Sequence, residues 1–335
     1  LSPLQEQNPA ASVTVSPVFK REHSLLEDIK ALDDNVSIRS RLSYSVTMKD
    51  NSRRLVMLDN APVTVEVTRS IMLLPDEKAF PRYADPRIGV FFSRKSRFGG
   101  PQQGVGTEYY AQRWRLQPSD TAAYFAGNKV EPVKPIVFYV DNAFPDSWKP
   151  YVKKGVEVWN KAFERIGFKD AVQARYFPEG DPEFDPDNIK YSCVRYSPSE
   201  VANSMGPSWT DPRTGEIINA SVYIYHNVVK LLSSWIFVQT AQADESVRTV
   251  TIPEEIIGEG IAYVVSHEVG HCLGLMHNMA GSSAVPVDSL RSPTFTQRYG
   301  TTYSIMDYAR YNYVAQPGDK DRGVRLSPPE MGEYD

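Results

Sequence analysis

The chain has 335 residues, of which 41% are hydrophobic and 23% are charged, and its formal net charge is −4. These values are typical of a globular protein, and the length allows one large domain or two modest ones. The small negative charge gives no overall field that attracts nucleic acid, so we expect no nucleic-acid partner. No apolar run approaches a membrane span, so we expect no transmembrane segment. The two cysteines, Cys193 and Cys272, neither demand nor exclude a disulfide, and we expect buried free thiols.

Residues 1–130 carry the pattern of β-strands. Hydrophobic and polar residues alternate at 63–68 and, less regularly, at 37–47, and the polar cluster at 49–52 favours a turn between them. No catalytic motif occurs in this region. We expect a β-rich N-terminal region, and the sequence leaves three roles open: a prosegment that covers a cleft, an accessory module, or a structural β-layer of the following domain.

Residues 131–335 show the alternation of strands and helices that is typical of α/β enzymes. Apolar residues at steps of three and four predict a helix that Gly167 ends: Val152, Val156, Trp159, Phe163 and Ile166. Strands are predicted by short apolar or alternating runs at 135–141, 171–177, 191–196 and 217–225. A second helix is predicted at 254–275. The expected fold class is therefore α/β (α+β), with one domain over residues 131–335.

The string at 267–277 reads HEVGHCLGLMH and fits the pattern H-E-x-x-H-x-x-G-x-x-H. Only 5 histidines occur in the chain, and His267, His271 and His277 lie in this string. On a helix, His267 and His271 lie about 40° apart around the axis and about 6 Å apart along it, so both imidazoles can reach one ion. Gly274 can end the helix in a left-handed conformation, and the chain then turns back and brings His277 to the same ion.

Three neutral imidazoles can hold Zn2+ and leave its fourth position for water, as catalytic zinc sites require. The ion lowers the pKa of that water towards neutrality, and Glu268, which follows His267 on the helix, is placed to accept the proton. Two alternatives remain open. The histidines can belong to an ordinary helix that binds no metal, or the protein can bind zinc without turnover.

The string resembles the signature of the metzincin metalloproteases. That family has a tight Met-turn beneath the zinc site, and Met306, which lies 29 residues after His277, is the candidate here. In some metzincin branches a tyrosine two residues after the methionine supports the transition-state oxyanion. Tyr308 has this offset, and a plain packed tyrosine is the alternative. Asn278, directly after the third histidine, matches none of the best-known branches.

The wider chain is similar to a poorly characterised group of large bacterial metzincin-like proteins, through segments at 135–141, 155–163 and 205–209. The resemblance implies a mixed twisted sheet, a zinc helix and a Met-turn, and it implies a secreted or cell-envelope location. In the family, an extended substrate binds along the strand nearest the cleft and joins the sheet as an additional antiparallel strand. We assign this role to the substrate-edge strand Asn219, Ala220, Ser221, Val222 and Tyr223.

The function that we expect is a zinc-dependent endopeptidase acting on a protein or peptide substrate, with Glu268 and Tyr308 as catalytic residues. An envelope protein that retains zinc and binds peptides or glycans without cleavage is the first alternative, and a zinc amidase is a less favoured one. Metzincins close their lower subdomain with a helix after the Met-turn. Residues 327–330 resemble a helix start and the chain stops at Asp335, which leaves the completeness of that helix open.

Overall fold

The computed structural model describes residues 13–99 and 104–335. Contacts divide the chain into two compact units. The first unit extends to Pro75 and includes Asp185–Lys190, and the second comprises Asp76–Phe184 and Tyr191–Asp335. Residues 76–130 are thus grouped with the unit that contains the histidine string. The functional division near residue 130, and the role of residues 1–130 as a prosegment or accessory module, stay predictions.

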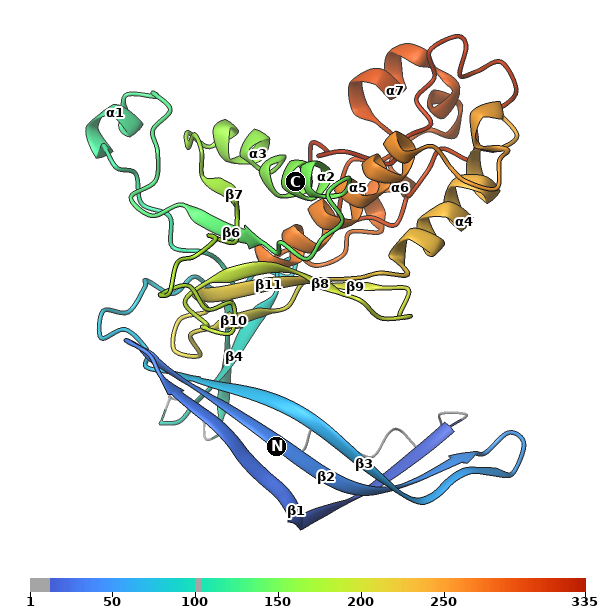
Figure 1. The fold of residues 1–335 in the computed structure, drawn as a ribbon. Helices are drawn as coiled ribbons and strands as arrows, with labels where there is room; N and C mark the ends of the chain where they lie inside the picture. The colour runs from blue at the N-terminus through green and yellow to red at the C-terminus, as the bar shows by residue number, and fades with distance from the viewer. Residues whose placement is uncertain (1–12, 100–103) are drawn as a thin grey trace. The chain divides into compact units, whose positions relative to one another are not determined.

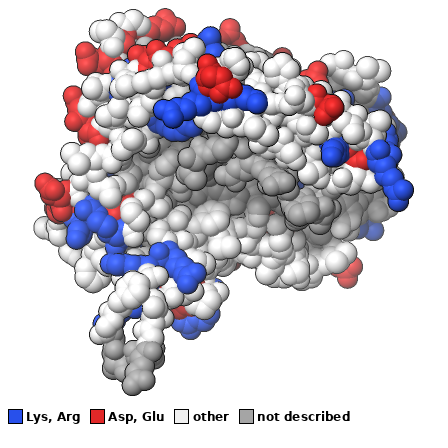
Figure 2. All heavy atoms as spheres, turned by 90° about the horizontal axis from the view of Figure 1, so that it is seen from below, with Lys and Arg blue, Asp and Glu red and all other residues white. Residues whose placement is uncertain are grey.

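The first unit is built on an antiparallel sheet of three long strands in the order β1-β2-β3 (Figure 1): Val13–Ala31, Asn35–Asp50 and Leu55–Met72. The prediction of a β-rich N-terminal region is confirmed. Arg39 and Arg41 of β2 form ion pairs with Glu27 of β1 and Glu66 of β3, so charges of opposite sign face each other across the sheet. Figure 2 shows that Lys, Arg, Asp and Glu side chains lie mainly around the rim of one face of the molecule.

The second unit begins with a hairpin and a short helix. The hairpin pairs β4 (Phe92–Arg97) with β5 (Gly106–Ala111) in antiparallel register. The helix α1 (Thr121–Phe125) starts at Asp120, whose side chain accepts a hydrogen bond from the Ala123 N–H.

A mixed sheet forms the centre of the second unit, with the order β10-β11-β8-β6-β7 and with β9 paired to β11. Three pairs of strands are parallel: β11 with β8, β8 with β6, and β6 with β7. The short strands β9 and β10 are antiparallel to β11. The six strands are Ile136–Val140, Val172–Tyr176, Ser192–Ser197, Ser204–Met205, Ser208–Thr210 and Ile217–Tyr225. The four strands predicted from the sequence correspond to β6, β7, β8 and β11, and the expected α/β (α+β) class is confirmed.

The substrate-edge prediction needs correction, because β11 is an interior strand. Ser221 and Tyr223 pair with β8 on one side, while Ala220 pairs with Ser208 of β10 and Tyr223 with Met205 of β9 on the other. The backbone of the predicted residues Asn219, Ala220, Ser221, Val222 and Tyr223 therefore lies between two neighbours. The edge of the sheet beside β11 is formed by β9 and β10 instead.

Helices cover one face of the mixed sheet (Figure 1). The helix predicted at 152–166 is divided into α2 (Lys149–Glu157) and α3 (Asn160–Arg165), and Gly167, with φ of 91°, follows the end of α3. The long helix α5 (Glu254–Cys272) packs against α2, against β11 and against α4 (Val228–Thr240). The core between these layers contains fully buried side chains from each of them, among them Phe138, Val156, Val222 and Val265.

The chain after α5 is mostly irregular. It contains α6 (Ala280–Ser283), α7 (Pro293–Tyr299) and a 3₁₀ turn at Val287–Arg291; another 3₁₀ turn, Glu245–Val247, precedes α5. The predicted helix start at 327–330 is not realised, because residues 327–335 adopt no helix. None of the helices in the described ranges combines the length and hydropathy that a membrane span needs.

Candidate metal centre

Helix α5 carries His267, Glu268 and His271 through the interior of the second unit. Its first turn holds Glu254 and Glu255, whose negative charges stabilise a helix N-terminus. From Ile257 onward almost every residue of α5 is buried, so tertiary packing on several sides fixes the helix and its histidines.

The end of α5 brings the third histidine back to the first two. Gly274 has φ of 102°, as predicted for a residue that ends the helix and turns the chain. Its carbonyl oxygen accepts a hydrogen bond from the Phe91 N–H, and the Met276 N–H donates to the Gly89 carbonyl. The segment that leads to His277 is therefore held by backbone hydrogen bonds to residues upstream of β4.

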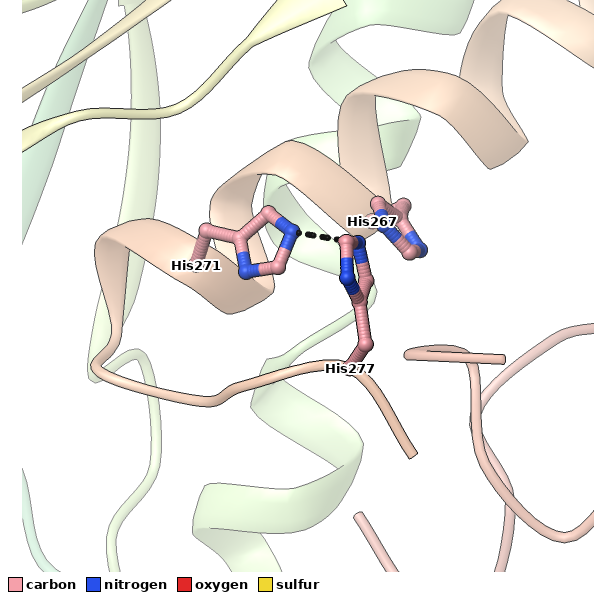
Figure 3. A group of neighbouring side chains, drawn as sticks. All are labelled: His267, His271 and His277. Atoms are coloured by element: carbon pink, nitrogen blue, oxygen red, sulfur yellow. Dashed lines mark hydrogen bonds between the residues drawn. The ribbon is translucent and has the colours of Figure 1, made fainter. Parts of the chain in front are cut away.

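Figure 3 shows the rings of His267 and His271, both from α5, next to the ring of His277 from the following loop. Their potential ligand atoms all lie within 4.8 Å of one another, and the Nε2 atoms of His271 and His277 are 3.1 Å apart. Two nitrogens bound to one tetrahedral zinc ion are roughly 3.3 Å apart. The structure therefore brings together the three residues that the sequence predicted as metal ligands.

Two of the rings are oriented by backbone carbonyl groups. The Nδ1 atom of His267 lies 2.8 Å from the Ile305 oxygen, and Nδ1 of His271 lies 2.8 Å from the Leu275 oxygen. A carbonyl oxygen can only accept, so both Nδ1 atoms carry the proton and both Nε2 atoms are left with a lone pair. Burial lowers the pKa of all three imidazoles, that of His267 to about 4. Neutral rings with free Nε2 lone pairs fit a divalent metal such as zinc.

Glu268 is 8% exposed, and burial raises the pKa of its carboxyl group. The Ser204 hydroxyl donates a hydrogen bond of 2.6 Å to Glu268 Oε1. A Cβ at Gly206 would collide with the Glu268 carbonyl oxygen, so this glycine lets the β9–β10 edge approach α5 closely. Sequence reasoning missed Ser204. The only signal was its position directly before the segment 205–209, which carries part of the family resemblance.

Met306 is fully buried beneath α5, as expected for the methionine of a Met-turn. The turn is connected to the histidines in two ways. The Ile305 carbonyl accepts a hydrogen bond from the His267 Nδ1–H, and the Asn278 N–H, next to His277, donates to the Met306 carbonyl. Asp335 fixes the other side of the turn, because its carboxylate accepts hydrogen bonds from the Ile305 N–H and the Ser304 hydroxyl.

Tyr308 lies beside the third histidine. Its hydroxyl oxygen is 2.8 Å from His277 Nε2, and the residue is 50% exposed. Desolvation raises the pKa of the phenol, so it stays protonated and able to donate a hydrogen bond near neutral pH. A catalytic role for Tyr308 stays a prediction. Cys272, on the adjacent turn of α5, is a buried free thiol, and so is Cys193, as predicted.

Comparison with known families agrees with this geometry. Residues 249–335 match a family described as Met-zincin, and residues 2–119 match a family described as a domain of unknown function (DUF5117). Searches of the curated proteins and of the solved structures found no match. The Met-zincin match spans the three histidines, Glu268, Met306 and Tyr308. Taken with the convergence of the three imidazoles, it supports a metzincin-like protein, with the likeness to Met-zincin lying in residues 249–335.

Proposed function

We propose that this chain is a zinc-dependent endopeptidase. One observation carries the proposal: three imidazoles converge within 4.8 Å, and the buried carboxyl group of Glu268 lies on the same helix, next in sequence to the first of them. Structural zinc sites use four protein ligands, whereas catalytic sites use three and keep one position open. Among the described residues, no further histidine, cysteine or carboxylate joins the group of three.

His267, His271 and His277 would hold the ion. When bound, zinc supplies a Lewis acid that polarises a carbonyl oxygen and makes water acidic near neutral pH. Glu268 accepts the proton of the attacking water and transfers it to the amine nitrogen that leaves when the peptide bond breaks. The raised pKa of Glu268 supports this double role, because a carboxyl group that titrates closer to neutral pH both takes up and releases a proton readily.

The residues around Glu268 supply orientation. Ser204 holds one carboxylate oxygen, which leaves the other free to face water. The substrate backbone would add to the edge formed by β9 and β10, since an edge strand offers N–H and C=O groups to an extended peptide. Tyr308 would donate a hydrogen bond to the oxyanion. The partner is then a protein or peptide substrate, and the resemblance to bacterial metzincin-like proteins supports a secreted or cell-envelope location.

The experiment is cleavage of casein by the wild-type chain, by Glu268→Gln and by Glu255→Gln. Glu255 is an exposed glutamate in the first turn of the same helix, so its substitution is a matched control. We expect wild type and Glu255→Gln to cleave equally, and Glu268→Gln to be slower by about 10²–10⁴-fold. Equal cleavage by all three would refute the role of Glu268. Bound zinc without cleavage in any of them would favour the binding-only alternative.

A further inference from the structure

A cavity of about 200 Å³ opens next to His267 and Glu268, and neither His271 nor His277 lines it. It lies between α4, the second half of α5, the start of β9 and the chain after Met306. The side chains that form its apolar walls are Val228, Leu231 and Trp235 of α4 and Val264 of α5.

Arg310 is the basic residue in the wall of this cavity. Its guanidinium carbon lies 4.0 Å from the ring centre of Trp235 and 5.8 Å from that of Tyr308, so two aromatic faces fix its plane. No described aspartate or glutamate forms an ion pair with it, whereas Arg213, Arg291 and Arg325 each have a carboxylate partner. The N–H groups at the edge of the guanidinium are therefore available to donate hydrogen bonds to a ligand.

The backbone of Arg310 supports a functional reason for this placement. Arg310 has φ of 47°, in the left-handed region that a residue with a long side chain adopts only at a cost. Such strain persists where the surrounding structure imposes it, and it occurs often at binding sites. Here it directs an arginine side chain, in a chain segment just past the Met-turn, to a cavity that adjoins the catalytic carboxyl group.

The position of the cavity identifies which part of a substrate would enter it. This step rests on the proposed function. Glu268 delivers a proton to the leaving amine, so the substrate residue that carries this amine lies on the Glu268 side of the site. The side chain of that residue would extend from the substrate backbone into the adjacent cavity. Of the three histidines only His267 lines the cavity, together with Glu268.

We propose that this cavity binds the substrate residue that follows the cleaved bond, and that Arg310 selects a carboxylate there. The apolar walls accept the methylene groups of such a residue. A carboxylate can take two charge-assisted hydrogen bonds from the guanidinium, whereas an apolar side chain would cover the same donors without an acceptor. The carboxylate can belong to a glutamate or aspartate side chain or to the C-terminus of a short substrate.

The test uses peptides of one sequence that differ only in the residue after the cleaved bond: Glu, Gln, Leu or Lys, each with an amidated C-terminus. For wild type we expect kcat/KM for Glu to exceed that for Gln about tenfold or more, the ratio that one charge-assisted hydrogen bond supports. Arg310→Gln should abolish this ratio, and Arg310→Glu should favour Lys. Arg298→Gln is the matched control at an exposed arginine, and it should keep the wild-type ratio.

A binding measurement separates failure of this inference from failure of the proposed function. The affinity of the same peptides for Glu268→Gln, followed by tryptophan fluorescence, should be about tenfold higher for Glu than for Gln, and the further change Arg310→Gln should remove this difference. Cleavage without any preference for Glu, together with equal binding, would overturn the inference and leave the protease proposal intact. Binding that favours Glu over Gln without any cleavage would support this inference and refute the protease proposal. A second set of peptides ends at the residue after the cleaved bond and carries a free C-terminal carboxylate. A gain in binding confined to this set, and lost with Arg310→Gln, would support carboxylate recognition and identify the chain end as its source.

Discussion

Gly270 lies where α5 packs against Met306, and its replacement by alanine tests that contact. A Cβ at this position would be 2.8 Å from Cζ2 of Trp159 and 3.2 Å from Cε of Met306, and it would be closer still to the Met306 sulfur. Optimal contacts between carbon atoms are about 3.5–4.0 Å. Trp159 and Met306 are both buried, so neither side chain has free space into which it can move.

The magnitude follows from two opposing effects. Alanine is favoured over glycine inside a helix by about 1 kcal/mol. Inserting a methyl group into a closely packed core costs about 1–3 kcal/mol, and the short distances at Gly270 place the cost near the upper end. We therefore expect Gly270→Ala to lower the free energy of unfolding by about 2 kcal/mol. Met306→Ala alone should lower it by about 3 kcal/mol, because it leaves a cavity.

The assay is urea unfolding of metal-free protein, which removes the contribution of ion binding to the free energy. Gly104→Ala is the control, because a Cβ at Gly104 meets nothing within 4 Å and should change little. The decisive sample is the double variant Gly270→Ala with Met306→Ala. Its loss should be clearly smaller than the sum of the two single losses, because the new methyl group occupies space that the methionine vacated. Losses that add within about 0.5 kcal/mol would refute the packing of Met306 against Gly270.

Two further predictions concern the loop to the third histidine and the last part of the chain. Gly274→Ala should weaken zinc affinity at least tenfold in a chelator competition, because its Cβ would collide with the Gln112 carbonyl and shift His277. The control is Gly318→Ala, which is also at positive φ but in open space and should leave zinc affinity unchanged. Hydrogen bonds and charge from Arg291 lower the pKa of Asp319 to about 2, so its contribution to stability is present above the ordinary pKa and is lost as pH falls from about 4 to 2. The Tm difference between wild type and Asp319→Asn should therefore be largest near pH 5 and shrink towards pH 2, and a constant difference would contradict this.

Residue spacing predicted the metal centre well because local geometry determines most of it. Two histidines four residues apart share a helix face whatever surrounds the helix, and Gly274 at a positive φ is a local requirement for the turn that follows. The apolar patterns of β6, β7, β8 and β11 were recognisable for the same reason, since burial on both faces leaves a continuous or alternating signal.

The neighbours of each strand could not be predicted in this way. The sequence indicated that β11 is a strand but not that β9 and β10 cover its outer side, because those strands are two and three residues long and show no periodicity. Ser204 was missed with them. At the C-terminal end, the proline-rich segment suggested a helix, but Asp335 bonds to the Ile305 N–H across the fold instead, a long-range contact that no local pattern contains.

The most direct test of the central claim is to measure metal content and casein cleavage on one preparation of wild type and one of Glu268→Gln. We predict about one zinc ion per chain in both, with cleavage in wild type and a loss of about 10²-fold or more in the variant. Zinc bound by His267, His271 and His277 does not require the Glu268 side chain, so the metal content should not change. A wild-type chain that binds no zinc under conditions in which it is folded would contradict the account.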